Sequence, residues 1–572
     1  MTTLQIKSRP RPGSINTSIN PVLATVLANR GIKEPNDLDL GLKNLLPPTG
    51  LSHIDLAAEL LSEAITAAAN VVIIGDFDAD GATSCALAVR CLKAFGLDSV
   101  SYLVPNRFEF GYGLSPEIVG VAATRQPDVI VTVDNGISSV DGVHAAQALG
   151  MSVLITDHHL PGEQIPTADV IVNPNLPGDK FASKNLAGVG VIFYVMLALR
   201  AKLRAMGWFE ASGIKEPNMS QFLDLVALGT VADVVPLDRN NRILVQQGLQ
   251  RIRNGQACEG IKALLAVGNR NTSRLATADL GFVIGPRLNA AGRLDDMSIG
   301  IEALLADDPS VAMCHASQLD ELNKERKQVE QSMQQDALGI LSSLETKSRE
   351  NQSIYLLHNE SWHQGVVGLV ASRMKERLAR PVIAMAPGDC SGEWKGSARS
   401  VEGVHIRDLL ARLDAVYPGL MVKFGGHAMA AGMSIKGENL ERFGKAISQI
   451  TDEFTQSHDW SQTIWTDGSL SADDFTIEMA ELLRQSSPWG QGFPEPVFDG
   501  NFEVMETRIV GLTHLKMRLR PTNSNQLVDG ICFGYMENNK QEPSGHVRLA
   551  YKLDVNEFRD RLTLQLIIQH IE

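Results

Sequence analysis

The sequence contains few cysteines, and their spacing forms no pattern. Six are scattered over 572 residues, and no two of them form a Cys-x-x-Cys pair. This argues against a zinc ribbon or a disulfide framework and is typical of a reducing compartment. No apolar run is long enough to span a bilayer, and residues 1–12 lack the apolar core of an export signal. We therefore expect a cytoplasmic protein with no membrane contact.

An excess of basic residues is also lacking. The 66 Asp and Glu residues outnumber the 52 Lys and Arg residues, which gives a formal net charge of −14. Proteins that bind nucleic acid by charge alone usually carry a basic excess, but a local basic groove can exist on an acidic body. We find no internal repeat and no low-complexity tract. Composition therefore leaves the binding partner open.

Strand-like and helical segments alternate in the first half of the chain. Short apolar runs lie at residues 71–74, 99–104, 128–133 and 152–156, a pattern that predicts βαβ units and a parallel sheet. After the first run, a helix is expected to open at about Thr83. Residues 315–347 predict a long amphipathic helix, and the short β-rich segments beyond residue 463 suggest a small barrel or sandwich.

These changes of pattern predict an α/β protein of five parts. We expect an N-terminal preface with short helices (residues 1–50), a parallel-sheet lobe (51–305) and a connecting helix (306–350). A second α/β lobe (351–455) and a β-rich domain (456–572) follow. At this length the chain has ample material for several buried cores.

Acidic residues and histidines follow the strand ends of the first lobe. They are Asp76, Asp78, Asp80, Asp134, Asp157, His158, His159 and, after a buried helix at residues 222–230, Asp233. Ligands of open α/β sheets bind beyond the carboxyl ends of the strands, and clustered carboxylates repel one another unless a cation neutralises them. One such residue alone is more often a helix cap or a structural histidine. As a set without thiolates they predict a site for two Mn²⁺ or Mg²⁺ ions.

The acidic residues form four motifs in a fixed order. They are Gly75-Asp-Phe-Asp-Ala-Asp-Gly81, Val133-Asp-Asn-Gly136, Asp157-His-His159 and Val231-Ala-Asp233. This series resembles the DHH phosphoesterase superfamily. Further segments resemble its bacterial RecJ branch: Pro105-Asn-Arg-Phe-Glu-Phe-Gly-Tyr-Gly113, Leu186-Ala-Gly-Val-Gly190, Ile284-Gly-Pro-Arg-Leu-Asn-Ala-Ala-Gly-Arg293, Trp362-His-Gln-Gly-Val-Val-Gly368 and Phe424-Gly-Gly-His-Ala428. The resemblance covers nearly the whole chain, with Gly492-Phe-Pro-Glu-Pro496 departing from the Gly-Asn-Pro-Glu-Pro of relatives.

The resemblance implies a DHH lobe, a DHH-associated lobe and a C-terminal OB-like barrel. It also implies a single-strand-specific DNA exonuclease that works from the 5′ end, releases mononucleotides and acts in recombination and repair. By motif match, Asp80, Asp134, His158 and Asp233 hold one metal ion, while Asp76 and Asp78 complete the site or recruit the second. We expect His159 to face the scissile phosphate, with Asp78 and Asp80 as the other catalytic residues. Single-strand-binding protein and a helicase are the implied protein partners of a monomer.

Recognition of a 5′ end requires groups that bind phosphate. Arginine presents fork-shaped donors to phosphate, and nearby glycines let the backbone approach it. We predict 5′-phosphate and DNA binding for Arg107, Arg287, Asn289, Arg293, Ser372, Arg373, Arg399 and His427. Arg399 is expected in a small-residue loop. His427 reads equally well as an active-site lid residue or as a capping residue in a tight strand-to-helix turn.

Two further sets of residues are candidates for contact with a single strand. Bases can stack on aromatic side chains without regard to sequence, and the aromatic candidates are Phe77, Phe108, Tyr112 and Trp362. In the β-rich tail, basic residues alternate with apolar ones and predict a charged sheet face. They are Lys516, Arg518, Arg520, Arg548 and Lys552.

Two other functions compete with this interpretation. A DHH phosphodiesterase for pyrophosphate, short oligonucleotides or cyclic dinucleotides has the same acidic motifs, but such relatives are generally shorter and lack the β-rich tail. A non-catalytic scaffold is disfavoured because every acidic and His position of the motifs is present. A dinucleotide-dependent dehydrogenase is excluded, since residues 75–81 contain no Gly-x-Gly-x-x-Gly and their carboxylates repel a pyrophosphate.

Overall fold

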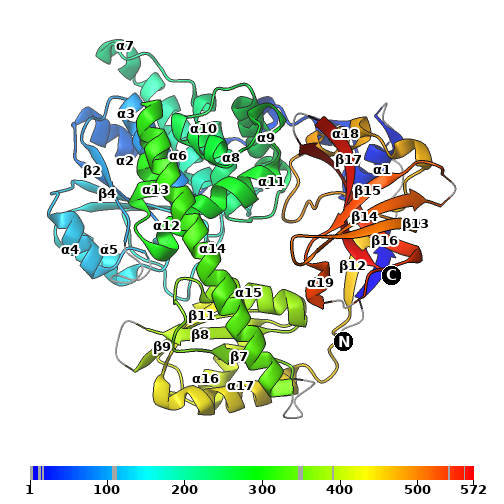
Figure 1. Ribbon diagram of the computed structural model, residues 1–572. Coiled ribbons are helices and arrows are strands. Elements are labelled where there is room, and N and C mark those ends of the chain that lie inside the picture. The colour runs from blue at the N-terminus through cyan, green and yellow to red at the C-terminus, as the bar shows by residue number, and fades with distance from the viewer. Residues whose placement is uncertain are drawn as a thin grey trace. The chain divides into compact units, whose positions relative to one another are not determined.

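The computed structural model describes residues 4–10, 15, 19–105, 113–345, 352–388, 392–522, 524–538, 541–558 and 561–572. The chain divides into two compact units (Figure 1). The smaller unit contains residues 1–5, 293–295 and 321–463, and the larger unit contains residues 6–292, 296–320 and 464–572. Within the described residues, no helix combines the length and the apolar character needed to cross a bilayer.

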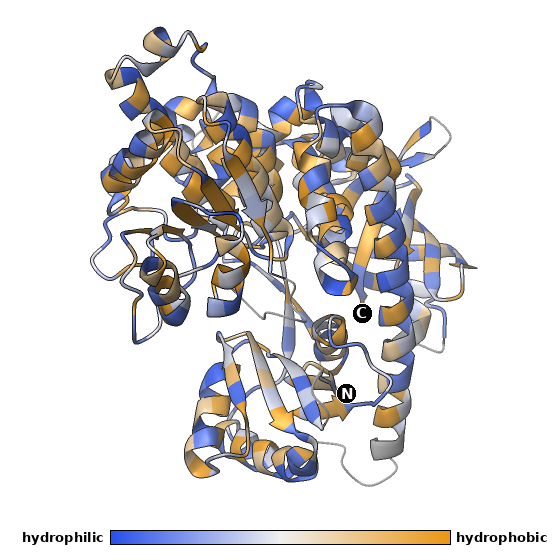
Figure 2. Ribbon diagram, turned by 90° about the vertical axis from the view of Figure 1, so that its left-hand side faces the viewer, coloured by the Kyte–Doolittle hydropathy of each residue, from blue (hydrophilic) through white to orange (hydrophobic). Residues whose placement is uncertain are grey.

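A five-stranded parallel sheet is the centre of the larger unit. Its strand order is β3 (Val100–Leu103), β2 (Val71–Ile74), β4 (Val129–Val133), β5 (Ser152–Thr156) and β6 (Val170–Val172). All four residues of β2 are fully buried, and the strands are coloured hydrophobic in Figure 2, as expected for a sheet covered on both faces. The chain passes from β2 to β3 on one side and then to β4 on the other. The carboxyl ends of β2 and β4 therefore flank a topological switch point.

Helices cover both faces of this sheet. On one face, α4 (Pro116–Ala123) and α5 (Val140–Ala148) pack on apolar residues of β2, β4 and β5. The other helices of this region are α2 (Ile54–Thr66), α3 (Ala79–Ala94), α6 (Gly188–Ala205), α7 (Trp208–Ser212), α8 (Leu223–Ala232), α9 (Arg239–Arg253), α10 (Glu259–Val267), α11 (Thr277–Asp279), the π-helix η6 (Leu280–Ile284), α12 (Gly285–Leu294) and α13 (Ser298–Leu305). Helix α3 packs against α6 and α8, which brings the first turns of α3 and α6 together.

Helix α3 begins four residues earlier than the sequence predicts. Its N-cap is Asp78, whose Oδ1 accepts hydrogen bonds from the backbone N–H groups of Asp80 (2.9 Å) and Gly81 (3.0 Å). An aspartate in this position satisfies donors that a helix N-terminus otherwise leaves without partners. The prediction of a start near Thr83 was therefore wrong, because Asp78 serves as a cap in addition to being a candidate ligand.

The smaller unit contains a mixed five-stranded sheet. Its order is β10 (Lys423–Gly426), β11 (Ala430–Lys436), β9 (Glu393–Arg399), β8 (Val382–Pro387) and β7 (Tyr355–His358). Only β7 and β8 pair in parallel among these described strands. Its helices are α15 (Val367–Leu378), α16 (Ile406–Val416) and α17 (Leu440–Phe454), and α14 (Pro309–Glu345) enters from the larger unit. The predicted connecting helix and second α/β lobe are both present.

The C-terminal strands close into a barrel. Their order is β13 (Phe498–Val510), β14 (His514–Pro521), β15 (Val528–Cys532), β17 (Arg561–Ile571) and β16 (Gly545–Phe558). Strand β13 is long, and its register with β14 shifts between Val504 and Glu506. Helix α18 (Ile477–Gln485) precedes the barrel and α19 (Tyr535–Asn538) follows β15. This confirms the predicted barrel.

The N-terminal preface differs from the expectation of short helices alone. Strand β1 (Leu4–Ser8) pairs with β12 (Gln462–Thr466), and α1 (Pro21–Ala28) follows. Just after α1, the Arg30 guanidinium binds both oxygens of Asp467 at 2.9 Å. Both side chains are buried, at 1% and 0% exposure. The preface is therefore tied to a segment more than 400 residues further along the chain.

Ion pairs join the barrel to the helical segment before α12, within the larger unit. Arg274, in that segment, binds Glu481 of α18 and also binds Glu557 of β16 at 2.9 Å, while Arg484 of α18 binds Asp279 of α11 at 3.4 Å. These residues, apart from Glu481, line a cavity of about 770 Å³. Charged groups thus link the barrel and α18 to this helical segment.

Candidate metal centre

All eight acidic and histidine residues of the predicted set lie at the carboxyl edge of the parallel sheet, and all except Asp157 belong to a candidate metal group. Asp76, Asp78 and Asp80 follow β2 or open α3, Asp134 follows β4, the two histidines follow β5, and Asp233 is the C-cap of α8. Their ligand atoms form three groups in which all atoms lie within 4.8 Å of one another. The groups are Asp80 with His158 and Asp233, Asp134 with His158 and His159, and Asp76 with Asp78 and Asp134.

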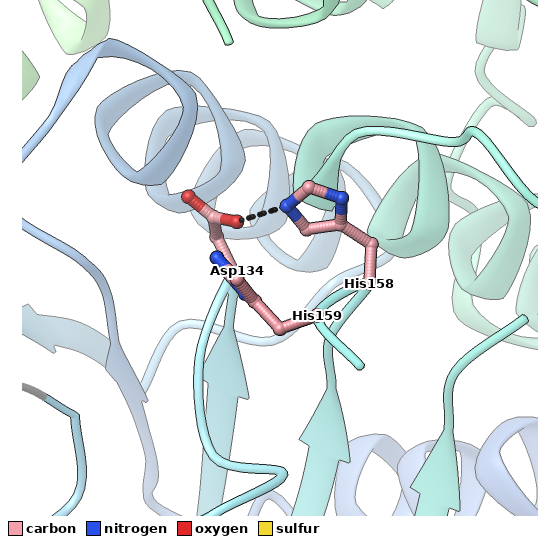
Figure 3. A group of neighbouring side chains, drawn as sticks. All are labelled: Asp134, His158 and His159. Atoms are coloured by element: carbon pink, nitrogen blue, oxygen red, sulfur yellow. Dashed lines mark ion pairs between the residues drawn. The ribbon is translucent and has the colours of Figure 1, made fainter. Parts of the chain in front are cut away.

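The neighbouring strands β4 and β5 bring one carboxylate and two imidazoles together (Figure 3). His158 Nε2 lies 3.2 Å from Asp134 Oδ1 and 3.5 Å from Asp233 Oδ2. The backbone is strained at the ligand Asp134, which has φ +61°, and at Val234, which follows the ligand Asp233 and has φ +62°. A β-branched residue such as valine rarely adopts this left-handed conformation. Strain of this kind persists only where the surrounding structure enforces it, and it is often found at functional sites.

The carboxylates are buried and lie close to one another, and both conditions oppose their ionisation. Asp80 is 1% exposed, and burial together with the charge of Asp78 raises its pKa to about 7. Burial and the neighbouring Asp80 likewise raise the pKa values of Asp134 and Asp233 well above their ordinary range. Ionising several such groups together requires a compensating positive charge.

Asp80 is held by the N-terminus of helix α6. Its Oδ2 accepts a hydrogen bond from Gly188 N at 2.6 Å, and its Oδ1 accepts one from Val189 N at 3.0 Å. Both donors belong to the first turn of the helix, where N–H groups lack intrahelical partners and the helix dipole favours negative charge. Each oxygen therefore has one lone pair occupied and another available to a cation.

A second carboxylate, Asp157, orients His159. Its Oδ1 lies 2.8 Å from His159 Nδ1, and its Oδ2 accepts a hydrogen bond from Ile137 N at 2.9 Å. Burial lowers the pKa of His159, but the hydrogen bond to Asp157 and the nearby carboxylates outweigh it and raise the pKa to about 9. The interaction with Nδ1 fixes the ring and leaves Nε2 on its opposite edge. Asp157 was predicted as one of the candidate metal ligands, but among the described residues it belongs to none of the three groups and contacts His159 instead.

Helix α12 contacts the acidic loop after β2. Asn289 Oδ1 accepts a hydrogen bond from Ala79 N at 2.8 Å, and a Cβ on Gly292 would lie only 1.8 Å from Phe77 O. Arg287, on the same helix, binds Asp320 Oδ1 through Nε at 2.9 Å and donates to Val283 O at 2.7 Å. In the described structure, Asn289 therefore binds the segment that carries the acidic ligands. The predicted residue Arg107, with Phe108 and Tyr112, lies outside the described residues.

The remaining phosphate candidates belong to the smaller unit, whereas the carboxylates belong to the larger one. Arg373 binds Glu330 at 3.1 Å with its side chain 56% exposed, and Ser372 Oγ donates to Gly368 O at 3.0 Å. Arg293 contacts Gly365 O at 3.3 Å. These three residues thus have protein partners in the smaller unit.

Two of the phosphate candidates occupy elements other than those predicted. Arg399 ends strand β9 and contacts Ser397 Oγ at 2.7 Å, so it does not lie in a loop. His427 lies in the turn between β10 and β11, where its N–H donates to Ala430 O, so the turn joins two strands and not a strand and a helix. Small residues misled both predictions, because they suit a tightly packed strand as well as a loop.

Acidic partners accompany most of the basic residues predicted on the barrel. Lys516 pairs with Asp529 and Arg548 with Asp499, at 3.2 and 2.9 Å. Arg520 pairs with Glu503, and Lys552 pairs with Glu495. Arg518 is exposed. The charge of this predicted face is thus largely balanced by neighbouring carboxylates.

The donor set fits a hard divalent cation. The candidate ligands are carboxylate oxygens and imidazole nitrogens, which suit Mn²⁺ and Mg²⁺, and no thiolate belongs to the three groups. Two of the groups share Asp134 and two share His158. Shared ligands and raised carboxyl pKa values are consistent with more than one ion at this edge of the sheet.

Family models match three separate parts of the chain. The DHH family N-terminal domain matches residues 70–230, the DHHA1 domain matches residues 350–453 and the RecJ OB domain matches residues 466–570. The first match contains Asp76 through His159 of the metal centre, and the third contains the barrel. The architecture predicted from the sequence is therefore confirmed.

Close relatives match over the full length. The chain is 51% identical over 574 residues to the single-stranded-DNA-specific exonuclease RecJ of Salmonella typhimurium, covering 99% of this chain and 98% of that protein. It is also 51% identical to the Escherichia coli protein of the same name, covering 96% of each. The crystal structure of RecJ from Thermus thermophilus with Mn²⁺ is similar at a TM-score of 0.79 and 28% identity, covering 100% of this chain and 79% of that one. The chain therefore belongs to the RecJ family of DHH proteins.

Proposed function

We propose that this protein is a metal-dependent exonuclease that degrades single-stranded DNA from the 5′ end to mononucleotides, in recombination and repair. The observation that carries the proposal is the gathering of five carboxylates and two imidazoles at the switch point of the sheet. Full-length similarity to proteins named single-stranded-DNA-specific exonucleases supports the choice of substrate. The protein hydrolyses phosphodiester bonds.

The metal ligands divide into two overlapping sets. Asp80, His158 and Asp233, with Asp134 by the family motif, would hold one Mn²⁺ or Mg²⁺ ion, and Asp76, Asp78 and Asp134 would hold a second. Relatives from Thermus thermophilus have been crystallised with each of these metals. Such ions, when bound, activate a water nucleophile and neutralise charge on the phosphate oxygens.

His159 acts on the scissile phosphate as proton donor and charge stabiliser. In the metal-free site, the hydrogen bond to Asp157 and the nearby carboxylates raise the pKa of this imidazole to about 9. Asp157 holds Nδ1, so that Nε2 is the nitrogen that presents a proton to the leaving oxygen. General acid catalysis requires both a suitable pKa and a fixed geometry, and Asp157 contributes to each as a positioning residue.

The 5′ end is recognised by arginines. Arg287 of the larger unit and Arg373 of the smaller unit each bind phosphate of the DNA, with Arg107 as a third candidate. Each of the first two has a carboxylate partner, Asp320 or Glu330, which orients its guanidinium before DNA arrives. A fork of donors that is already oriented loses less entropy when phosphate binds.

The C-terminal barrel binds the single strand beyond the cleavage site. OB folds commonly provide this function through stacking and backbone contacts, and Arg518 is an exposed cation on strand β14. From the family resemblance we infer a cytoplasmic monomer that works with single-strand-binding protein and with a helicase supplying unwound DNA.

The test uses a long single strand labelled at either end, incubated with Mn²⁺ or with EDTA beside a blunt duplex. Metal-dependent release of mononucleotides from the 5′ end, absent on the duplex, is the expected result. Cleavage confined to di- to pentanucleotides would instead support a phosphodiesterase of short substrates, and binding without cleavage would support a scaffold. Asp134→Ala is expected to abolish cleavage, and near-normal turnover of this variant with Mn²⁺ would refute the ligand assignment.

A further inference from the structure

Two glycines on different helices contact the carboxylates of the metal centre. Gly188 is the first residue of α6, and its N–H donates to Asp80. A Cβ added to Gly188 would lie 2.5 Å from Asp134 Cβ and 2.6 Å from Asp134 Oδ1. Non-bonded carbon atoms normally stay at least 3.5 Å apart. A side chain on Gly188 would therefore displace Asp134.

The second glycine lies in helix α8, one turn before Asp233. The carbonyl of Gly229 accepts the N–H of Asp233 at 2.9 Å, so this residue also fixes the end of the helix that carries a candidate ligand. A Cβ on Gly229 would lie 2.6 Å from Asp80 Oδ1 and 2.2 Å from Thr83 Oγ1. Asp80 is thus enclosed by the backbone of α6 on one side and by that of α8 on another.

We propose that Gly188 and Gly229 are positioning residues that set the geometry of the metal ligands. Without side chains, they allow α6 and α8 to approach Asp80 and Asp134 so closely that these carboxylates have a single position. The inference rests on the proposed metal-dependent function and extends it to residues with no ligand atom on a side chain. Glycine in a helix costs roughly 1 kcal/mol relative to alanine, so its use at Gly229 indicates a local requirement for space.

The requirement predicts a difference between metals. Mg²⁺ demands near-ideal octahedral geometry at 2.0–2.1 Å and tolerates displaced ligands poorly. Loss of groups that orient metal ligands typically weakens metal affinity about 10–100-fold. We expect Gly188→Ala to weaken Mn²⁺ binding within that range and to weaken Mg²⁺ binding more. A role in helix packing alone would lower stability without favouring one metal.

The experiment measures metal binding directly on the full-length chain. Mn²⁺ is titrated by electron paramagnetic resonance and Mg²⁺ by calorimetry, while the midpoint of thermal unfolding is recorded in EDTA. Gly120→Ala is the matched control, because Gly120 lies in α4 and a Cβ there meets nothing within 4 Å. Unchanged affinity for both metals in Gly188→Ala would overturn the proposal. Absence of metal binding in the wild type would instead refute the proposed function.

A second variant covers the case in which Gly188→Ala is unstable. Asp134→Gly removes the side chain that the new methyl group would strike, and glycine also suits the left-handed φ of this position. If the clash with Asp134 causes the instability in EDTA, the double variant Gly188→Ala with Asp134→Gly is expected to unfold at the same temperature as Asp134→Gly alone. An instability that persists in the double variant would show ordinary packing and overturn the proposal.

Discussion

Replacing Asp80 by asparagine should stabilise the metal-free protein while destroying its metal site. The pKa of Asp80 is about 7 in the folded protein, against an ordinary value of 3.8. A tenfold change in an equilibrium constant corresponds to about 1.4 kcal/mol, so the ionised form of this buried carboxyl costs roughly 4 kcal/mol at pH 8. Asparagine avoids this cost. The asparagine amide, however, has one acceptor oxygen for two backbone N–H donors. The hydrogen bond that is lost lowers the stability by about 1–3 kcal/mol, which offsets part of the gain.

The effect depends on pH with a definite sign. The carboxyl ionises near pH 3.8 when unfolded and near pH 7 when folded. The contribution of Asp80 to the free energy of unfolding of the wild type is therefore highest below about pH 4. It decreases as the pH rises and becomes constant above about pH 7. We expect Asp80→Asn to gain about 1–3 kcal/mol over the wild type at pH 8. The advantage should shrink by about 2 kcal/mol at pH 5.5, where the folded wild type holds its proton.

Differential scanning calorimetry in EDTA measures this difference. For a folding unit the size of the larger unit, about 420 residues, a stabilisation of about 2 kcal/mol corresponds to an increase in unfolding temperature of roughly 2–3 °C. The exposed Asp98 provides the control, and Asp98→Asn is expected to change stability by less than about 0.5 kcal/mol. With Mn²⁺ at about 100 times its Kd, the wild type alone should gain about 2.7 kcal/mol. A lower unfolding temperature of Asp80→Asn at pH 8, or an equal difference at both pH values, would refute the reasoning.

Three further substitutions probe other contacts. Asp157→Asn removes a charge that raises the pKa of His159, so the alkaline limb of the pH–kcat profile should move to lower pH and kcat should fall. Asn289→Ala removes the hydrogen bond to the acidic loop, and we expect a loss of about 1 kcal/mol in thermal stability together with weaker Mn²⁺ binding by calorimetry. Asp467→Asn leaves the buried Arg30 guanidinium without its charge partner, which should cost about 3–5 kcal/mol in urea unfolding.

Each of these predictions has an outcome that contradicts it. An alkaline limb that stays in place in Asp157→Asn would exclude this carboxylate as the group that sets the protonation of His159. Wild-type Mn²⁺ affinity in Asn289→Ala would show that the loop keeps its shape without the side chain. Asp467→Asn with wild-type stability would show that the preface contributes little to the fold.

The parallel sheet and the position of the metal centre were predictable from the sequence for a physical reason. β-branched runs buried on both faces belong to parallel strands, and the ends of such strands meet at one edge. The side chains that follow them, such as Asp134 and His158, must therefore come close together. The start of α3 was misplaced because Asp78 has two chemical uses, as ligand and as cap, and a one-dimensional pattern reveals only one at a time.

Other features could not be predicted because their partners lie far apart in sequence. Nothing near Arg287 indicates that Asp320 would bind it, and nothing in residues 4–8 indicates a partner strand at residues 462–466. The backbone donors to Asp80 leave no side-chain signal, although the Leu-Ala-Gly-Val-Gly segment that supplies them was noted as a family feature. Distances and backbone approach are properties of the fold and not of composition.

The ion pairs between the barrel and the helical layer affect how salt experiments should be interpreted. Arg274 and Arg484 bind Glu557 and Asp279 in partly exposed positions, and added salt weakens such pairs because the Debye length falls from about 8 Å at 0.15 M to about 3 Å at 1 M. Added salt also weakens DNA binding, because binding releases counterions from the phosphates. A salt titration of cleavage will therefore combine two processes, loosening of the barrel from the helices and loss of phosphate contacts. The slope of such a titration overstates the number of phosphates that the protein touches.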